Sequence, residues 1–297
     1  MDQQSTGTSS AQAKDVYGVF EGGGVKGIAL VAAVAAFEEE KIGFHAVAGT
    51  SAGAIVAALI AAGFSAPEMK DILIEKNFED FKDPISTKPL WRWYKAYKKM
   101  GFYHGDAFRN WINGLLEKKL NKVQPRMEDL PKPLTVYATN LFNRRIDWFK
   151  GPKGVVGERY LQEPIASAVR ASMSIPGFFV PHECASNTFV DGGVLSNFPG
   201  FAFEEDVKFH PLPVVGFRLD SGDHSGPVEN SNQLISAIID TVVSHNSNNN
   251  LPETNIINLP TLGISTTDFD ITKEQKGHLY GWAKTSTENW LLTNTIT

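Results

Sequence analysis

The chain lacks the features that mark exported or membrane-spanning proteins. Cys184 is the only cysteine among 297 residues, so no disulfide can form within the chain, which fits a reducing compartment. The longest apolar run, 28–37, is far shorter than the ~20 residues that a bilayer-spanning helix needs. Residues 1–14 lack the apolar core of a signal peptide. We therefore expect a cytoplasmic protein with at most peripheral membrane contact, and export by a route without a signal peptide stays open.

Positive charge is also scarce. The 28 Lys and Arg residues are outnumbered by 33 Asp and Glu, which gives a net charge of −5 and no reason to expect a nucleic-acid partner. The composition, 42% hydrophobic and 21% charged, is that of an ordinary globular protein. Residues 1–14, rich in Ser, Thr, Gln and Ala, are expected to be a disordered arm. The remainder, 15–297, has no repeat and no break in composition, so we expect one domain.

Two strand–turn–helix units open this domain. A strand over 15–21 runs into three glycines and a helix over 26–40, and a strand over 44–49 precedes a helix over 52–62. This alternation is typical of a parallel sheet with helices packed on its faces. Further strands are predicted at 133–140, 145–149, 188–191, 212–219 and 256–259, and further helices at 163–172, 231–244 and 272–292.

Residues 49–53 have the form Gly-x-Ser-x-Gly, with Gly49, Ser51 and Gly53 at the defining positions. In a nucleophile elbow the serine lies on a tight turn between a strand and a helix, where flanking glycines relieve crowding. The N-terminus of the following helix favours negative charge at the same point. The pentapeptide alone also fits an ordinary turn, but its place between an apolar strand and an Ala-rich helix favours Ser51 as a nucleophile.

A glycine loop joins the first expected strand to its helix, and it consists of Gly22, Gly23 and Gly24, followed by Lys26 and Gly27. Its spacing fits the dinucleotide pattern G-x-G-x-x-G, but no acidic residue ends a second strand ~20 residues later, as that pattern requires. A Walker loop is excluded because isoleucine follows Gly27. Backbone amides of the loop are therefore predicted to bind the oxyanion of a tetrahedral acyl intermediate. Lys26 could attract an anionic headgroup or steady the loop, and an ordinary surface position at the start of the helix fits it as well.

A third element, Asp191 with Gly192 and Gly193, ends the strand expected at 188–191. An aspartate at a strand end can bring its carboxylate close to the end of another strand, and the glycines behind it leave room. An ordinary glycine-rich turn explains most Asp-Gly-Gly strings. The element therefore indicates a functional site only in combination with the other two.

The three elements, in this order, resemble the patatin-like phospholipases, and the resemblance extends from about residue 17 to residue 292. Looser matches lie at 101–106, 171–179 and 268–272. Glu21 departs from the family pattern, in which Asp is frequent, and we do not expect this to affect catalysis. The resemblance implies an α/β fold in three layers, α/β/α, with a mostly parallel central sheet. It also implies that neither a cofactor nor a metal, calcium included, is needed.

The resemblance further implies the chemistry of a phospholipase A or lysophospholipase. Ser51 attacks an acyl ester while Asp191 accepts its proton, and water then hydrolyses the acyl-enzyme. The amides of Gly23 and Gly24, together with that of Gly22, hold the oxyanion. The phospholipid or other acyl ester is thus the expected partner of this dyad.

Two other interpretations stay open. An α/β-hydrolase with a Ser-His-Asp triad also uses the elbow and has its histidine later in the chain, where His245 and His278 occur. That fold normally has several strands before the elbow, whereas one strand precedes the strand that leads to Ser51 here. A catalytically silent regulatory or lipid-binding module would be expected to lack Ser51 or Asp191, and both are present.

The segment 82–100 bears on the substrate class. It holds six basic residues and one acidic residue, Asp83, in a chain that is otherwise acidic. Its aromatic and basic residues separate on a helical wheel, with Leu90, Trp93, Tyr94 and Tyr97 on one side and Arg92, Lys95 and Lys99 on the other. Such a helix either lies on an anionic lipid surface or packs its aromatic side against the core. Its presence favours phospholipid over small soluble esters, with peripheral membrane contact through 82–100.

Overall fold

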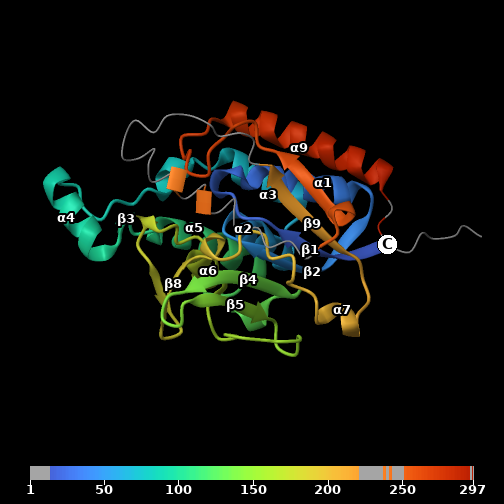
Figure 1. Cartoon of the computed structure of the whole chain (residues 1–297), viewed down its shortest axis with the longest axis horizontal. Coiled ribbons are helices and arrows are strands. Elements are labelled where there is room, and N and C mark those ends of the chain that lie inside the picture. The colour runs from blue at the N-terminus through green and yellow to red at the C-terminus, as the bar shows by residue number, and fades with distance from the viewer. Residues whose placement is uncertain (1–13, 221–236, 239–240, 243–250, 295, 297) are drawn as a thin grey trace, which may run out of the picture.

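The computed structural model describes residues 14–220, 237–238, 241–242, 251–294 and 296 (Figure 1). Apart from residue 14, the arm expected at 1–14 lies outside the described residues. His245 and most of the helix expected over 231–244 also lie outside them, although 237–238 and 241–242 are helical.

An eight-stranded sheet forms the centre of the molecule (Figure 1). β1 (Lys14–Phe20) lies between β2 (Ile42–Thr50) and β9 (Val214–Asp220), and both pairings are parallel. β10 (Ile256–Pro260) continues the parallel part beyond β9, and β4 (Leu134–Asn140) continues it beyond β2. The carboxyl ends of β1 and β2, where the glycine loop and the elbow begin, therefore lie at the same edge of the sheet.

The other end of the sheet is antiparallel. β5 (Arg145–Gly151) pairs with one edge of β4 along its whole length. The opposite edge of β4 is shared, because its first half pairs with β2 and its second half with β8 (Asn187–Asp191), which is followed outward by β7 (His182–Cys184). β2 runs parallel to β4 and β8 runs antiparallel to it. The carboxyl ends of β2 and β8 therefore meet head-on.

Helices cover one face of the sheet. α1 (Gly27–Glu39) and α2 (Ala52–Ala61) follow β1 and β2 and are buried along most of their length. A helix that is apolar on all sides must be covered on all sides, and α9 (Lys273–Thr293) packs across α1 to provide this cover (red in Figure 1). The same layer includes α3 (Ala66–Glu75), α5 (Asp106–Leu120) and α6 (Ile165–Ser172), whose apolar residues join the same core cluster.

The opposite face of the sheet is covered by the segment that follows β8. Tyr17 and Val19 of β1 point to this side and join a second apolar cluster with Phe198 and Phe203. The rings of Tyr17 and Phe203 are stacked, with their centroids 4.6 Å apart. This layer contains the short helix α7 (Asp206–Phe209). β1 is thus buried on both faces, which explains its nearly continuous apolar sequence.

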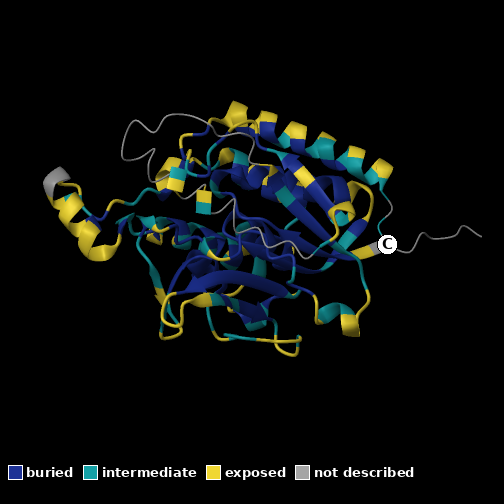
Figure 2. Ribbon diagram, in the orientation of Figure 1, coloured by how far each residue is buried: buried dark blue, intermediate teal, exposed yellow. Residues whose placement is uncertain are grey.

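Helix α4 (Pro89–Lys99) projects from this body, at the left of Figure 1, and Figure 2 shows that most of it is exposed. It ends at Met100 and leads directly into β3 (Gly101–Tyr103), which pairs with β6 (Gly177–Phe179) in a separate two-stranded sheet. None of the helices in the described ranges is long and apolar enough to cross a membrane.

The expected α/β architecture, a sheet flanked by helices, is confirmed. The sheet is more mixed than the expected mostly parallel one, because four strand pairings are parallel and three are antiparallel. The antiparallel part arises where β4 turns back into β5 and where β8 approaches from the opposite direction. β3, β6 and β7, which were not expected, have three residues each and are too short to show a period of two.

Candidate active site

Ser51 lies on the turn between β2 and α2. Its backbone has φ 51° and ψ −118°, a strained conformation for a residue with a side chain. The Ser51 carbonyl oxygen accepts hydrogen bonds from the amides of Ala54 and Ile55, so Ser51 directly precedes the first turn of α2. The serine therefore occupies the positive end of a helix on a strained strand-to-helix turn, as a nucleophile elbow requires.

The two glycines of this elbow are required by close packing. A Cβ atom on Gly49 would lie 2.4 Å from the backbone of Gly53, and one on Gly53 would lie 2.2 Å from the carbonyl oxygen of Phe20. The ends of β1 and β2 and the start of α2 thus meet without room for side chains. This agrees with the expectation that these glycines relieve crowding around the serine.

Ser172, at the end of α6, supports the elbow. Its Oγ accepts a hydrogen bond from the Ser51 amide at 2.8 Å and donates one to the Tyr137 carbonyl oxygen at 2.6 Å. Ser172 is fully buried, so the two bonds tie the strained backbone of Ser51 to β4. No local pattern identifies this role, because a buried serine at a helix end gives no sign of which distant backbone group it contacts.

The paired strand ends bring Asp191 to the elbow. Thr50 ends β2 and Asp191 ends β8, and the two lie opposite consecutive residues on the same edge of β4. Gly192 permits this approach, because a Cβ atom there would lie 2.5 Å from the Tyr137 carbonyl oxygen and 2.8 Å from Thr50 Cγ2. Ser51 and Asp191, far apart in the sequence, are brought together in this way.

The carboxyl group of Asp191 is buried, with 3% of the residue exposed. Its Oδ1 accepts a hydrogen bond from the Gly193 amide at 2.8 Å, whereas Oδ2 has no partner of ordinary geometry among the described residues. Burial raises the pKa of Asp191 to about 7, and hydrogen bonding from Gly193 and from the Ser51 hydroxyl limits this rise. The group can therefore exchange a proton near neutral pH, next to a serine hydroxyl.

The glycine loop passes the same point. The Gly22 amide donates to the Asn197 carbonyl oxygen at 3.0 Å and is thus already engaged. The amides of Gly23 and Gly24 make no hydrogen bond to any of the described residues. Gly24 has φ 56°, and a Cβ atom there would lie 2.0 Å from the Thr266 carbonyl oxygen. Of the three donors expected for an anion, two remain available.

Glu21 and Asn197 hold this loop in place. Asn197 Nδ2 donates to Glu21 Oε1 and to the Gly22 carbonyl oxygen, both at 3.1 Å. Glu21 Oε2 accepts a hydrogen bond from the Leu219 amide at 2.6 Å, which ties the loop to β9. Glu21 therefore has a structural role, and Asn197 is a supporting residue that its neighbours in the sequence do not reveal.

Lys26 and Gly27 lie where the loop enters α1. Lys26 is buried, with 5% of the residue exposed, and its Cε lies close to Gly23. This excludes the ordinary surface position that the sequence left open for Lys26. Gly27 faces Ala52 of α2, where a Cβ atom would make an ordinary contact at 3.6 Å, so packing does not demand glycine at this position.

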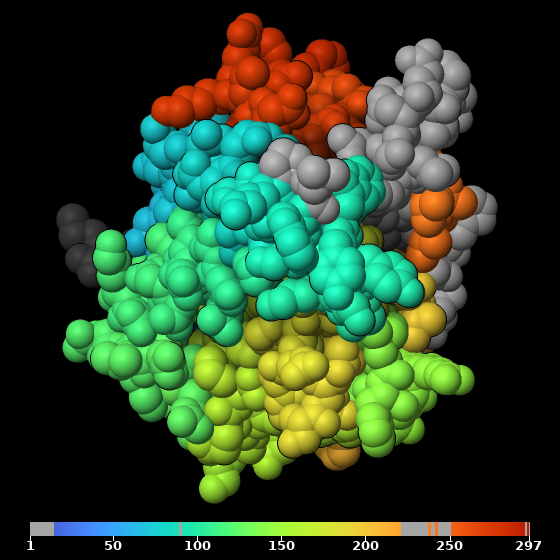
Figure 3. Space-filling model, turned by 90° about the vertical axis from the view of Figure 1, so that its left-hand side faces the viewer, coloured from blue at the N-terminus to red at the C-terminus, as the bar shows by residue number. Residues whose placement is uncertain are grey.

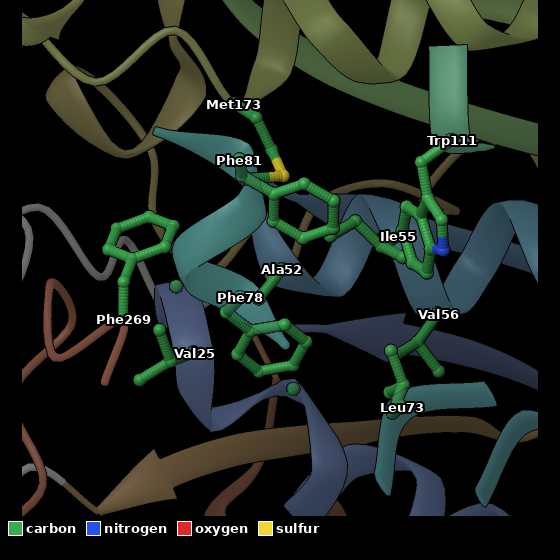
Figure 4. Close-up of a pocket in the computed structure, with 12 residues that line it drawn as sticks. Val25, Ala52, Ile55, Val56, Leu73, Phe78, Phe81, Trp111, Met173 and Phe269 are labelled. Carbon is green, nitrogen blue, oxygen red and sulfur yellow. The ribbon is translucent and has the colours of Figure 1, made fainter. Parts of the chain in front are cut away.

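An apolar pocket lies beside the elbow (Figure 4). It has a volume of about 420 Å³, including the part that is open to solvent. Gly24 of the glycine loop and Ala52, the residue after Ser51, are among its lining residues, as are Ile55 and Trp111. The other lining residues are Val25, Gly27, Val56, Leu73, Phe78, Phe81, Met173 and Phe269. None of these side chains is charged, so the pocket suits an apolar chain.

Histidines take no part in this arrangement within the described ranges. Neither Ser51 nor Asp191 has a hydrogen bond to a histidine there, and His278 is exposed on α9. His245 lies outside the described residues. The described part of the chain also contains no group of His, Cys, Asp and Glu residues that could hold a metal ion.

Known proteins share both the sequence pattern and the fold. A model of the patatin-like phospholipase family matches residues 18–203. An uncharacterized protein of Bacillus subtilis, YqhO, is 37% identical over 92% of this chain and 97% of its own length. A cGAMP-activated phospholipase of Escherichia coli is 26% identical over 61% of this chain and 52% of its own length, so this chain matches about half of that protein. Among solved structures, VipD from Legionella pneumophila has a TM-score of 0.55 at 19% identity, over 95% of this chain and 67% of that chain, which shows a shared fold.

The raised pKa of Asp191 predicts that Asp191→Asn stabilises the protein at alkaline pH. In the unfolded chain the carboxyl group ionises near ~3.9, so folding must bury a carboxylate at higher pH, at a cost that grows until the pH reaches about 7. Removing the carboxylate should recover up to ~4 kcal/mol at pH 8, of which burying the new amide offsets ~1–3 kcal/mol.

Urea unfolding of wild type and Asp191→Asn between pH 4 and pH 8.5 measures this difference. The free energy of unfolding of the variant, relative to wild type, should rise with pH and level off above neutrality. A difference that does not change with pH would show that Asp191 ionises in the folded protein as it does in the unfolded chain.

Proposed function

Because the chain belongs to the patatin-like phospholipase family, we propose that it is a lipid acyl hydrolase with Ser51 and Asp191 as its catalytic dyad. The observation that carries the proposal is the buried Asp191 carboxyl group, with a pKa near neutrality, beside a strained serine at a helix N-terminus. The proposed substrate is the carboxylic ester of a phospholipid or lysophospholipid. Relatives that are named as phospholipases support this substrate class.

The proposed reaction begins with attack of Ser51 Oγ on the ester carbonyl carbon. The hydroxyl proton passes to the Asp191 carboxylate as the C–O bond forms, and the carbonyl oxygen becomes an oxyanion. When the tetrahedral intermediate collapses, the ester bond breaks, Asp191 returns the proton to the leaving alcohol, and an acyl ester of Ser51 remains. Water then gives a proton to Asp191 and attacks the carbonyl carbon of this ester. When the bond to Ser51 Oγ breaks, the fatty acid is released and Asp191 returns the proton to Ser51 Oγ.

The environment of Asp191 supports its role as the base. A carboxylate with a pKa near ~3.9 has little tendency to take a proton from a hydroxyl group, and a general base works best when its pKa lies near the operating pH. Burial raises the pKa of Asp191 into that range. The hydrogen bond from the Gly193 amide keeps Oδ1 fixed, which leaves Oδ2 for the proton.

The proposed oxyanion hole consists of the Gly23 and Gly24 amides. Both belong to the loop at the end of β1, and neither donates to another of the described residues. The Gly22 amide, which was expected to take part, is omitted because it donates to the Asn197 carbonyl oxygen. The N-terminus of α2 adds partial positive charge near Ser51.

The apolar pocket is proposed as the site of the fatty acyl chain. Its wall includes Gly24 of the proposed oxyanion hole and Ala52, the residue after the nucleophile. An acyl group attached to Ser51 would thus have its carbonyl oxygen at the glycine loop and its chain in the pocket. Each buried methylene group contributes ~0.8 kcal/mol to binding, so the pocket favours long-chain esters over short ones.

Two other functions receive less support. A silent lipid-binding module on this fold has no need for a buried, proton-accepting carboxyl group beside the elbow, yet Asp191 has both properties. A Ser-His-Asp triad requires a histidine between the acid and the serine, and in the described residues Asp191 itself interacts with Ser51. The dyad accounts for both observations.

We expect Ser51→Ala to abolish hydrolysis and covalent labelling. Wild type should release fatty acid from vesicles of phosphatidylglycerol and phosphatidylcholine, detected by mass spectrometry, and should react with a fluorophosphonate probe. Ser186→Ala is a matched control, because Ser186 is exposed and also has a positive φ, 59°, so this variant should behave as wild type. Labelling of Ser51→Ala at the wild-type level would assign the nucleophile to another residue.

The pKa of Asp191 also sets the expected pH dependence of the rate. Because Asp191 must be ionised to accept the proton, kcat/KM for an uncharged short-chain ester should rise through a single ionisation near pH 7. Asp191→Asn should lower kcat by at least ~10²-fold and remove this ionisation. A wild-type profile that is flat from pH 5 to pH 9 would contradict a base with a raised pKa.

Filling the pocket should change the preference for acyl chain length. The larger side chain of Ile55→Trp would occupy the space of roughly two methylene groups, so kcat/KM for a 16-carbon ester should fall by ~10-fold or more. The rate for a 4-carbon ester should fall much less, and the volume-conserving Ile55→Leu should keep the wild-type preference. An equal loss for both chain lengths in Ile55→Trp would place the acyl chain elsewhere.

A further inference from the structure

Helix α4 exposes large aromatic side chains that do not contribute to the core. Trp91 is 56% exposed, Trp93 63%, Tyr94 55% and Tyr97 82%. Of the residues from 91 to 99, only Arg92 and Ala96 are not exposed, and they lie one helical turn apart on the side that faces the body. The alternative that the aromatic residues of 82–100 pack over the core is therefore wrong.

The side of α4 that faces the body contacts β3. Arg92 Nη2 donates a hydrogen bond to the Tyr103 hydroxyl at 3.0 Å, and the Trp93 ring meets the Phe102 ring edge-on with centroids 5.0 Å apart. Arg92 was expected on the basic side of the helix with Lys95 and Lys99, and the structure instead places it against β3. The helix is thus held at its base while most of its aromatic surface remains in solvent.

Positive charge accompanies these aromatic side chains. Lys95, Lys98 and Lys99 are exposed, and α4 contains no acidic residue. None of the three lysines forms a salt bridge with another described residue. This unpaired positive charge lies in a chain whose net charge is −5, so it is concentrated locally rather than typical of the surface.

We propose that the exposed side of α4, residues 91–100 without Arg92 and Ala96, binds the surface of an anionic lipid membrane. Tryptophan and tyrosine favour the headgroup level of a bilayer, where the ring is buried and its polar atom stays hydrated. The lysines attract anionic headgroups. Figure 3 looks onto this side of the molecule, where α4 (turquoise) lies at the centre and faces outward. A protein partner or a second copy of the chain could also bury the aromatic rings. Neither would explain as well why three lysines without a salt bridge lie beside those rings.

A series of side-chain contacts joins α4 to the pocket. Arg92 bonds to Tyr103, whose ring packs on Phe178 with centroids 4.7 Å apart. Phe178 in turn stacks on Phe269 at 4.8 Å, and Phe269 lines the pocket. Docking at α4 would hold the membrane beside this side of the pocket wall. A role for docking in supplying substrate to the pocket rests on the proposed lipid hydrolysis. The proposal that α4 binds a membrane does not depend on that function.

Vesicle binding tests the role of the lysines. Wild type should sediment with phosphatidylglycerol vesicles, less so as salt is raised, and much less with pure phosphatidylcholine vesicles. Each basic residue near an anionic leaflet strengthens binding roughly fivefold, so Lys95/Lys98/Lys99→Gln should weaken it by ~10²-fold. Hydrolysis of a soluble short-chain ester should stay at the wild-type level, since none of the three lysines belongs to the site.

A matched variant controls for net charge. Lys41, Lys118 and Lys153 are also exposed and do not belong to α4. Lys41/Lys118/Lys153→Gln therefore makes the same change in charge and should bind vesicles almost as wild type does. Ser51→Ala should bind vesicles fully, which separates docking from hydrolysis. If the two lysine variants bind equally, the attraction is a property of the whole molecule and the proposed surface is wrong.

A second variant tests the aromatic side chains. Trp91/Tyr94/Tyr97→Ser should reduce binding that persists at high salt, and its circular dichroism and soluble-ester activity should match wild type. Light scattering during gel filtration tests whether a second copy of the chain, rather than a membrane, covers this surface. If wild type is a dimer, this variant is a monomer, and neither binds phosphatidylglycerol vesicles, then the surface joins two copies of the chain and the membrane proposal fails.

Discussion

The structure depends on one feature of strand pairing, which is that β2 and β8 share a single edge of β4 from opposite directions. Neither strand can extend further, because the other occupies the next positions of the ladder. β2 therefore ends at Thr50 and β8 ends at Asp191, opposite consecutive residues of β4. The backbone must leave the sheet in a sharp turn after each of these two residues. Ser51 with a strained backbone and Gly192 pressed against the Tyr137 carbonyl oxygen are consequences of this meeting.

The position of Asp191 where β2 and β8 meet also explains why its carboxylate lowers the free energy of unfolding. A carboxyl group at the junction of two strands has protein on all sides, so burial raises the pKa of Asp191 and opposes its ionised form. The surrounding contacts offset this cost by fixing the backbone, as Ser172 does for Ser51 and the Glu21–Asn197 pair does for the glycine loop. The site is preorganised by hydrogen bonds between segments that are distant in the sequence.

Two apolar features lie outside the sheet and give the site its proposed relation to lipid. The pocket beside the elbow suits a single acyl chain, whereas the aromatic side of α4 suits the surface from which such chains are taken. Arg92, Tyr103 and Phe178 connect the two features through direct contacts. The proposed active site and the proposed lipid-binding surface are thus parts of one continuous packing arrangement.

Patterns of neighbouring residues were enough to predict part of this protein. The strand–turn–helix units, the crowding at Gly49 and Gly53, and the glycine loop follow from local backbone geometry, so they could be predicted with boundaries correct to a few residues. Which loop amides remain available, and which residues support Ser51, depends on the packing of distant segments, because the Gly22 amide donates to the Asn197 carbonyl oxygen and the Ser51 amide donates to Ser172. The tertiary structure also decided that the aromatic residues of α4 face solvent. These outcomes depend on contacts between distant segments, and no pattern within one segment can specify its partner.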